Sequence, residues 1–149
     1  MRLWDLTLEE LVAGRMPIPY PDVDDLPPQA FKDEWIVPIS TNIRFATTAA
    51  AGSADMQDQV LLERVGDRWE AVGSFIGSTL EINKRARRKG LAIELVLRCM
   101  EHRASLDSLG AHISHAGLEV LKKAHREAVL RALRAKLDVP KLVRDDYGL

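Results

Sequence analysis

The feature that most constrains the fold of this chain is a change of hydrophobic period at Gly90. Before that glycine, short runs rich in β-forming residues are separated by tight turns, and after it apolar residues recur at helical spacing. The runs are Gln59–Val65, Trp69–Ile76 and Thr79–Ile82, with Gly66-Asp67-Arg68 and Gly77-Ser78 between them. This pattern predicts an antiparallel meander of strands that leads directly into a helix.

The residues before the meander predict a helix, an extended arm, a strand and a loop. A capping box at Thr7 predicts a helix within Asp5–Arg15. Prolines are frequent in Met16–Pro28, which indicates an extended arm that lies on a surface or is loosely attached. The apolar run Glu34–Ile39 predicts a strand, and Pro38 places it at a sheet edge or at a strand end. The small, polar residues of Ala46–Asp58 predict a mobile loop.

The residues after the meander predict a short strand between two helices. The first helix should end between Ser105 and Gly110, and only Ala111–Ile113 is left for a strand. The second helix should begin at an N-cap on Ser114 and continue to about Lys136. The tail that follows is expected to dock through Leu142 and Tyr147.

This order of elements predicts an α+β fold in one domain of 149 residues. We expect the helix, the proline-rich arm and a variable region in 1–58, a core in 59–113, and the long helix with its tail in 114–149. A net charge of −1 excludes a strong overall field that would attract nucleic acid or a membrane. The lone Cys99, together with the absence of a signal-like or membrane-spanning apolar run, favours a soluble protein of the cytoplasm.

The stretch Leu80–Ala92, LEINKRARRKGLA, combines the end of the meander with a cluster of cations. Leu80 and Ile82 alternate with polar residues, and five cations then occupy six positions. The cations are Lys84, Arg85, Arg87, Arg88 and Lys89. The first turn of a helix has free N–H groups and the positive end of the helix dipole, and small residues at Gly90 and Ala92 let an anion approach that backbone. The sequence therefore predicts an anion-binding junction between a strand and a helix.

Residues 87–92 also carry the pattern R-x-x-G-x-A, which resembles the acetyl-CoA pyrophosphate loop of the GNAT superfamily of N-acetyltransferases. The resemblance covers about residues 59 to 104 and implies a GNAT-like fold, acetyl-CoA as cofactor and an amine as acceptor. It implies that the backbone of Leu80 and Ile82 binds the pantetheine arm. It also implies that the pyrophosphate is held by Arg87, Arg88, Lys89, Gly90, Leu91 and Ala92.

The resemblance does not supply a proton donor for the leaving thiolate. Members of this family use a tyrosine on the helix after the fifth strand, and the corresponding position here is Leu121. The chain has two tyrosines, Tyr20 and Tyr147, both in segments expected to be irregular. Glu81, on the strand beside the expected thioester, is the candidate general base.

Other interpretations of the chain stay open at this stage. The basic loop is also typical of nucleic-acid contacts or of a solvated surface, so a non-catalytic binding protein on the same scaffold is the alternative function. The four histidines have no zinc-like spacing, and no metal site is predicted. The arm is a candidate surface for a protein partner, and the arm or the last helix for a homodimer. The segment that begins at Ser114 resembles a module of small bacterial proteins from plasmids and phages, which suggests a mobile element.

Overall fold

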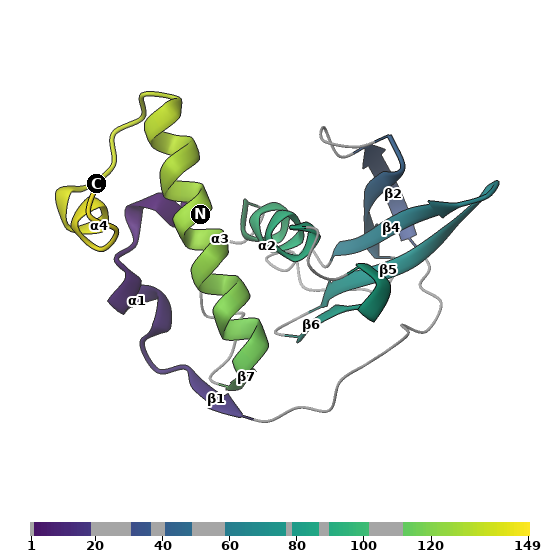
Figure 1. The fold of residues 1–149 in the computed structure, drawn as a ribbon, viewed down its shortest axis with the longest axis horizontal. Helices are drawn as coiled ribbons and strands as arrows, with labels where there is room; N and C mark the ends of the chain where they lie inside the picture. The colour runs from purple at the N-terminus through teal and green to yellow at the C-terminus, as the bar shows by residue number, and fades with distance from the viewer. Residues whose placement is uncertain are drawn as a thin grey trace.

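The computed structural model describes residues 2–18, 31–36, 41–48, 59–76, 79–86, 90–101 and 112–149. These residues form an α+β fold in which helices cover an antiparallel sheet. The longest of these helices lies in the C-terminal part of the described chain. Figure 1 shows helix α2 (Leu91–Glu101) between the sheet and helix α3 (His115–Arg134). Helix α4 (Lys141–Asp145) lies on the other side of α3, next to the C-terminus.

The sheet has the strand order β2-β3-β4-β5-β6, and all neighbours are antiparallel. Its strands are β2 (Phe31–Ile36), β3 (Ile43–Thr48), β4 (Gln59–Val65), β5 (Arg68–Ile76) and β6 (Thr79–Ile82). Two further strands, β1 (Met16–Ile18) and β7 (His112–Ser114), pair with each other in parallel. The remaining elements are the 3₁₀ turns η1 (Leu3–Asp5) and η2 (Lys84–Ala86) and helix α1 (Leu8–Val12).

The predicted meander is confirmed as β4, β5 and β6. Gly66 has a φ of +66°, which suits the tight turn of the β4–β5 hairpin. The register of that hairpin shifts between Leu61 and Leu62, because Leu61 pairs with Gly73 while Leu62 pairs with Ala71. Val72 is thus the extra residue of a β-bulge, and bulges commonly re-aim the strand around them.

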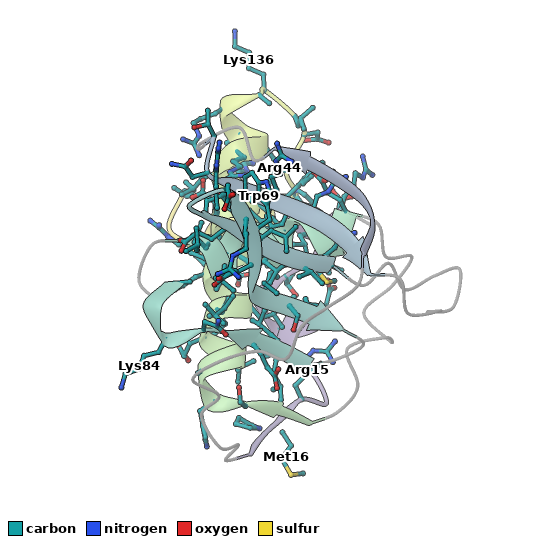
Figure 2. All side chains as sticks on the ribbon, turned by 90° about the vertical axis from the view of Figure 1, so that its right-hand side faces the viewer. Arg15, Met16, Arg44, Trp69, Lys84 and Lys136 are labelled. Carbon is teal, nitrogen blue, oxygen red and sulfur yellow. The ribbon has the colours of Figure 1, made fainter. Side chains whose placement is uncertain are left out.

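The main core lies between one face of the sheet and helix α2. From β3 and β4, Phe45 and Leu61 are buried there, and Leu95 and Cys99 of α2 pack in the same cluster. On the opposite face, Val60 and Leu62 are buried in a smaller cluster that includes Trp69. Arg44 places its guanidinium carbon 4.1 Å from the centroid of the Trp69 ring, a cation–π contact visible in Figure 2.

The helix-start predictions are confirmed by their hydrogen bonds. The Glu10 amide donates to Thr7 Oγ1 at 3.1 Å and the Thr7 amide donates to Glu10 Oε2 at 3.0 Å, which completes the capping box of α1. Ser114 accepts a hydrogen bond from the Gly117 amide at 2.9 Å and caps α3. The apolar side of α3 is buried, with Leu118, Leu121, Ala124, Ala128 and Ala132 among its residues.

Several sequence-based boundaries need correction. Residues Ala46–Thr48 belong to β3, so the loop predicted from Ala46 was wrong there; the remainder of that loop lies outside the described residues. The strand predicted at Glu34–Ile39 is β2, which begins earlier, at Phe31. The strand predicted at Ala111–Ile113 is β7, His112–Ser114.

The predicted docking of the tail is half right. Tyr147 packs with Trp4, Val129 and Val143, but the side chain of Leu142 is 68% exposed and does not dock. Most of the proline-rich arm, residues 19–28, and the end of the helix after Glu101 lie outside the described residues. Within the described ranges, no helix has both the length and the apolar character that a bilayer span requires.

Candidate functional site

Hydrogen bonds from Asn83, the residue directly after β6, join the end of this strand to the bulge of β5. Asn83 is buried, its backbone N–H donates to the carbonyl oxygen of Val72 at 2.7 Å, and its Nδ2 donates to that of Ala71 at 3.3 Å. The short polar side chain of Asn83 thus donates to a backbone carbonyl oxygen directly beside the bulged residue. The bonds of Asn83 determine where the strand stops and the loop begins.

The same bonds determine which way the backbone of β6 faces. In an antiparallel pair, successive residues alternate between pointing their N–H and C=O groups at the partner strand and away from it. Because Asn83 points at β5, Glu81 does too, whereas Leu80 and Ile82 present their backbone groups to the other edge of β6. β6 is the last strand of the described sheet, so this edge is the border of that sheet.

The side chains of β6 alternate between the two faces as predicted. Leu80 and Ile82 are partly buried and pack against the main core. Glu81 lies opposite Ser74, which is 4% exposed, and Glu81 itself is half-buried on the face away from that core. Glu81, the candidate base, thus follows Leu80 on the border strand and has its side chain on the opposite face of the sheet.

A 3₁₀ turn and a glycine connect β6 to α2. The Ala86 amide donates to the Asn83 carbonyl oxygen at 2.9 Å, and Ala86 is buried, so the first part of the loop is held against the protein. Lys84, at the start of this turn, is exposed and projects away from the ribbon in Figure 2. Arg87, Arg88 and Lys89, three of the predicted anion ligands, lie outside the described residues.

Gly90 occupies the position immediately before α2 with a φ of +74°. This left-handed conformation is one that glycine adopts without steric cost. Gly90 is exposed, and a Cβ at this position would meet no atom of the described residues within 4 Å apart from its chain neighbours. Leu91 is buried in the core and anchors the helix start, and Ala92 is half-buried. The first turn of α2 thus has its N-terminal amides beside an open surface, as an anion site requires.

One acidic residue lies in that first turn, and it is paired. Glu94 binds the guanidinium of Arg131 on α3 through both of its carboxylate oxygens. The hydrogen bonds that Arg131 donates to Glu94 raise the pKa of Arg131, although burial of the guanidinium acts in the opposite direction. Arg131 Nε also contacts Glu127 Oε1 at 2.9 Å. The Arg131 charge therefore offsets an acid that would otherwise oppose anion binding at the helix start.

None of the described residues considered as proton donors lies at the junction of β6 and α2. Leu121 is 2% exposed and belongs to the main core, so this position contributes packing and no hydroxyl. Tyr147 lies just after α4, and its hydroxyl is 2.5 Å from Nδ1 of His125. Figure 1 shows α3 between α4 and the sheet, so Tyr147 is separated from β6 by that helix. Tyr20 lies outside the described residues.

The structure thus brings Leu80, Glu81, Ile82, Gly90 and Ala92 to one junction and leaves Tyr147 elsewhere. Sequence reasoning missed Arg131, because its partner Glu94 is 37 residues away and no local pattern links them. A hollow of about 430 Å³ on α3 includes none of the predicted site residues, and it is lined by Glu127, Leu130, Leu133 and Arg134. Among the described residues, no three side chains of the metal-binding types come together.

Comparison with family models, curated proteins and solved structures found no match to this chain.

Proposed function

We propose that this protein is an acetyl-CoA-dependent N-acetyltransferase with a GNAT-like core, which acts on an amine of a small molecule or a protein. The observation that carries the proposal is the conformation of Gly90: a positive φ, at an open surface, at the start of α2 and directly after the loop from the border strand β6. A pyrophosphate is the part of acetyl-CoA that such a helix start favours.

The described residues fit the cofactor in two respects. The backbone edge of β6 at Leu80 runs toward the loop and suits the amide groups of a pantetheine arm, which pair with a strand edge as another strand would. The acid in the first turn of α2 is offset by Arg131. In the proposal, Ile82 belongs to the same edge, and Arg87, Arg88, Lys89, Gly90, Leu91 and Ala92 hold the pyrophosphate.

The chemistry of the reaction would be divided between the cofactor and Glu81. Acetyl-CoA, when bound, supplies an activated acyl group as a thioester. Glu81 is the described carboxylate on the strand whose edge would face that thioester, and its role would be to accept the proton of the attacking amine. As the new amide bond forms, the C–S bond of the thioester would break, and CoA would leave as a thiolate that takes its proton from water.

A binding protein without turnover is the second candidate, and two observations favour it. Leu121 is buried where the related enzymes are expected to have a tyrosine, and the hydroxyl of Tyr147 is occupied by His125. In this alternative the basic loop contacts a phosphate-bearing partner, of which nucleic acid is one class. Binding to nucleic acid would weaken steeply as salt increases, because each neutralised phosphate releases counterions.

The experiment that separates these candidates measures thiol release from acetyl-CoA with a panel of primary amines. The enzyme proposal predicts amine-dependent release of free CoA, and it predicts that Glu81→Gln lowers the rate by roughly 10²-fold or more, as loss of a general base does. Acetyl-CoA binding without release for any amine would support the binding protein. An unchanged rate in Glu81→Gln would remove Glu81 from the mechanism.

A further inference from the structure

A buried histidine connects the two ends of the chain, and nothing in the proposed function uses it. His125 is on α3 and is 0% exposed. Its Nε2 lies 2.8 Å from the carbonyl oxygen of Leu6, and its Nδ1 lies 2.5 Å from the hydroxyl of Tyr147. Next to Tyr147, Asp146 Oδ2 accepts a hydrogen bond from the Leu8 amide at 2.7 Å. We call this set of contacts, made by Leu6, Leu8, His125, Asp146 and Tyr147, the terminal clasp.

The partners of His125 determine where its proton lies. A backbone carbonyl oxygen can only accept, so Nε2 must carry a hydrogen and donate to Leu6. In a neutral imidazole, Nδ1 is then an acceptor, and the Tyr147 hydroxyl donates to it. Both ring nitrogens and the hydroxyl are satisfied by this one tautomer. A second proton, on Nδ1, would take away the acceptor for the tyrosine O–H and would put a charge in a buried site.

Burial of the imidazole favours its neutral form. Burial lowers the pKa of His125 below its ordinary value of 6.5, and this effect outweighs the backbone carbonyls of Leu6 and Leu3 and the carboxylate of Asp146, which act in the opposite direction. From the C-terminal turn the facing groups are Asp146 and Tyr147, and burial raises the pKa of Tyr147, so its hydroxyl keeps its proton. From the N-terminal side, the charged residue of η1 is Asp5, which pairs with Arg2 at 2.8 Å.

The two segments that meet at the clasp differ in how firmly they are attached. Leu3 and Leu11 of the N-terminal segment are buried in the main core. The C-terminal segment packs in a separate, smaller cluster through Val139 and Val143. A segment with a small cluster of its own opens at a lower free energy than one anchored in the main core. If the clasp opens, it is therefore the C-terminal segment that leaves.

We propose that the terminal clasp is a pH-sensitive device: the neutral, Nε2-protonated imidazole of His125 holds residues 139–149 against the N-terminal segment, and gain of a second proton releases them. The direction follows from linkage. His125 binds its second proton less tightly in the closed clasp than in the open one, where its pKa is close to the ordinary value of 6.5. The closed clasp is therefore fully stable above pH 6.5 and loses stability as the pH falls below this value. The equilibrium constant for opening should then rise by up to tenfold per pH unit.

Hydrogen exchange of the full chain between pH 7.5 and 5 tests the proposal. After correction for intrinsic rates, the amides of Leu8 and Leu149 should become progressively less protected as the pH falls, while the β4–β5 hairpin stays protected. His125→Gln should open the clasp at every pH and remove the pH dependence. His115→Gln, at an exposed histidine of the same helix, is the matched control and should keep the wild-type profile.

Three results would overturn the proposal. They are a pH-independent opening constant in the wild type, the wild-type slope persisting in His125→Gln, and the slope disappearing in Asp146→Asn, which would assign the titration to the carboxylate. If His125→Gln does not fold, long-range ¹H–¹⁵N spectra of the wild-type protein give the answer alone. The proposal is supported if Nε2 alone carries a proton at pH 7.5 and Nδ1 gains the second proton below pH 6.5. A proton on Nδ1 at pH 7.5 contradicts it.

Discussion

At Gly90 a single residue sets the geometry on which the proposed cofactor site depends. Its φ of +74° lets the chain turn from the loop into α2, and the open space beside it leaves room for a ligand. Gly66 has a φ of +66° and is also exposed, with no atom of the described residues within 4 Å of an added Cβ apart from its chain neighbours, but it lies in the β4–β5 turn and does not precede a helix. The two glycines therefore share their backbone requirement and differ in their proposed function.

This difference gives a matched pair of variants. Gly90→Ala and Gly66→Ala should each destabilise the protein by about 1–2 kcal/mol, because both put a Cβ on a left-handed backbone. Only Gly90→Ala should also weaken acetyl-CoA binding, and thermal unfolding together with calorimetry measures the two effects. Equal affinities for the two variants would separate Gly90 from ligand binding.

Single residues were predictable where their role depends on near neighbours. Thr7 with Glu10, Ser114 and the glycine turns all act within four residues of themselves, and the sequence was sufficient to identify them. His125 was not identified, because its partners Leu6 and Tyr147 are 119 and 22 residues away. Leu142 was predicted to dock on hydrophobicity alone, which does not determine which side of a one-turn helix faces the protein.

At the scale of elements, the contact between α2 and α3 is also an electrostatic feature of the candidate site. The pair Glu94–Arg131 joins the first turn of α2 to the last turn of α3. As a link between helices, the pair would be weakened by loss of either partner. At an anion site, the carboxylate of Glu94 would repel the ligand, whereas the guanidinium of Arg131 would attract it.

Variants of this pair should therefore change affinity in opposite directions. Arg131→Met leaves Glu94 uncompensated at the helix start and should weaken acetyl-CoA binding about two- to fivefold, whereas Glu94→Gln should strengthen it by a similar factor. The double variant should return close to wild type. Calorimetric titration checks this, and a loss of affinity in both single variants would mean that the pair only holds the helices together.

The start of α3 depends on a side-chain cap that the sequence predicted. Ser114→Ala removes the acceptor for the Gly117 amide and should lower the free energy of unfolding by about 1 kcal/mol, while Ser114→Asn keeps a capping oxygen and should lower it less. Chemical denaturation of the two variants measures the difference. Identical losses would show that the cap contributes little beside the packing of the buried stripe of α3.

Elements were predicted where period and turn chemistry agree, and missed where composition concealed the period. Ile43 and Phe45 alternate with polar residues and are buried in β3, but the small residues that follow them led to the prediction of a loop from Ala46. The alternation was the signal that could have identified the strand. The junction of β6 and α2 was predicted, because both the strand period and the helix period meet at Gly90.

At the scale of the whole molecule, the α+β class followed from the order of elements, and the pairings between distant segments did not. The parallel pairing of β1 with β7 joins Met16 to His112, and no pattern in either segment specifies the other. The terminal clasp is non-local in the same way. The strand-to-helix junction of the candidate site could be predicted from the sequence, whereas the ion pair between Glu94 and Arg131 became visible only in the fold.

The central claim is that the β6–α2 junction binds acetyl-CoA, and isothermal titration calorimetry of the full chain tests it most directly. We expect saturable binding of one acetyl-CoA per chain, its loss in Gly90→Asp, and its retention in Gly66→Asp, which carries the same charge and backbone strain at another open turn. The absence of any binding heat for the wild-type protein at several temperatures, or equal binding by the two aspartate variants, would contradict the claim.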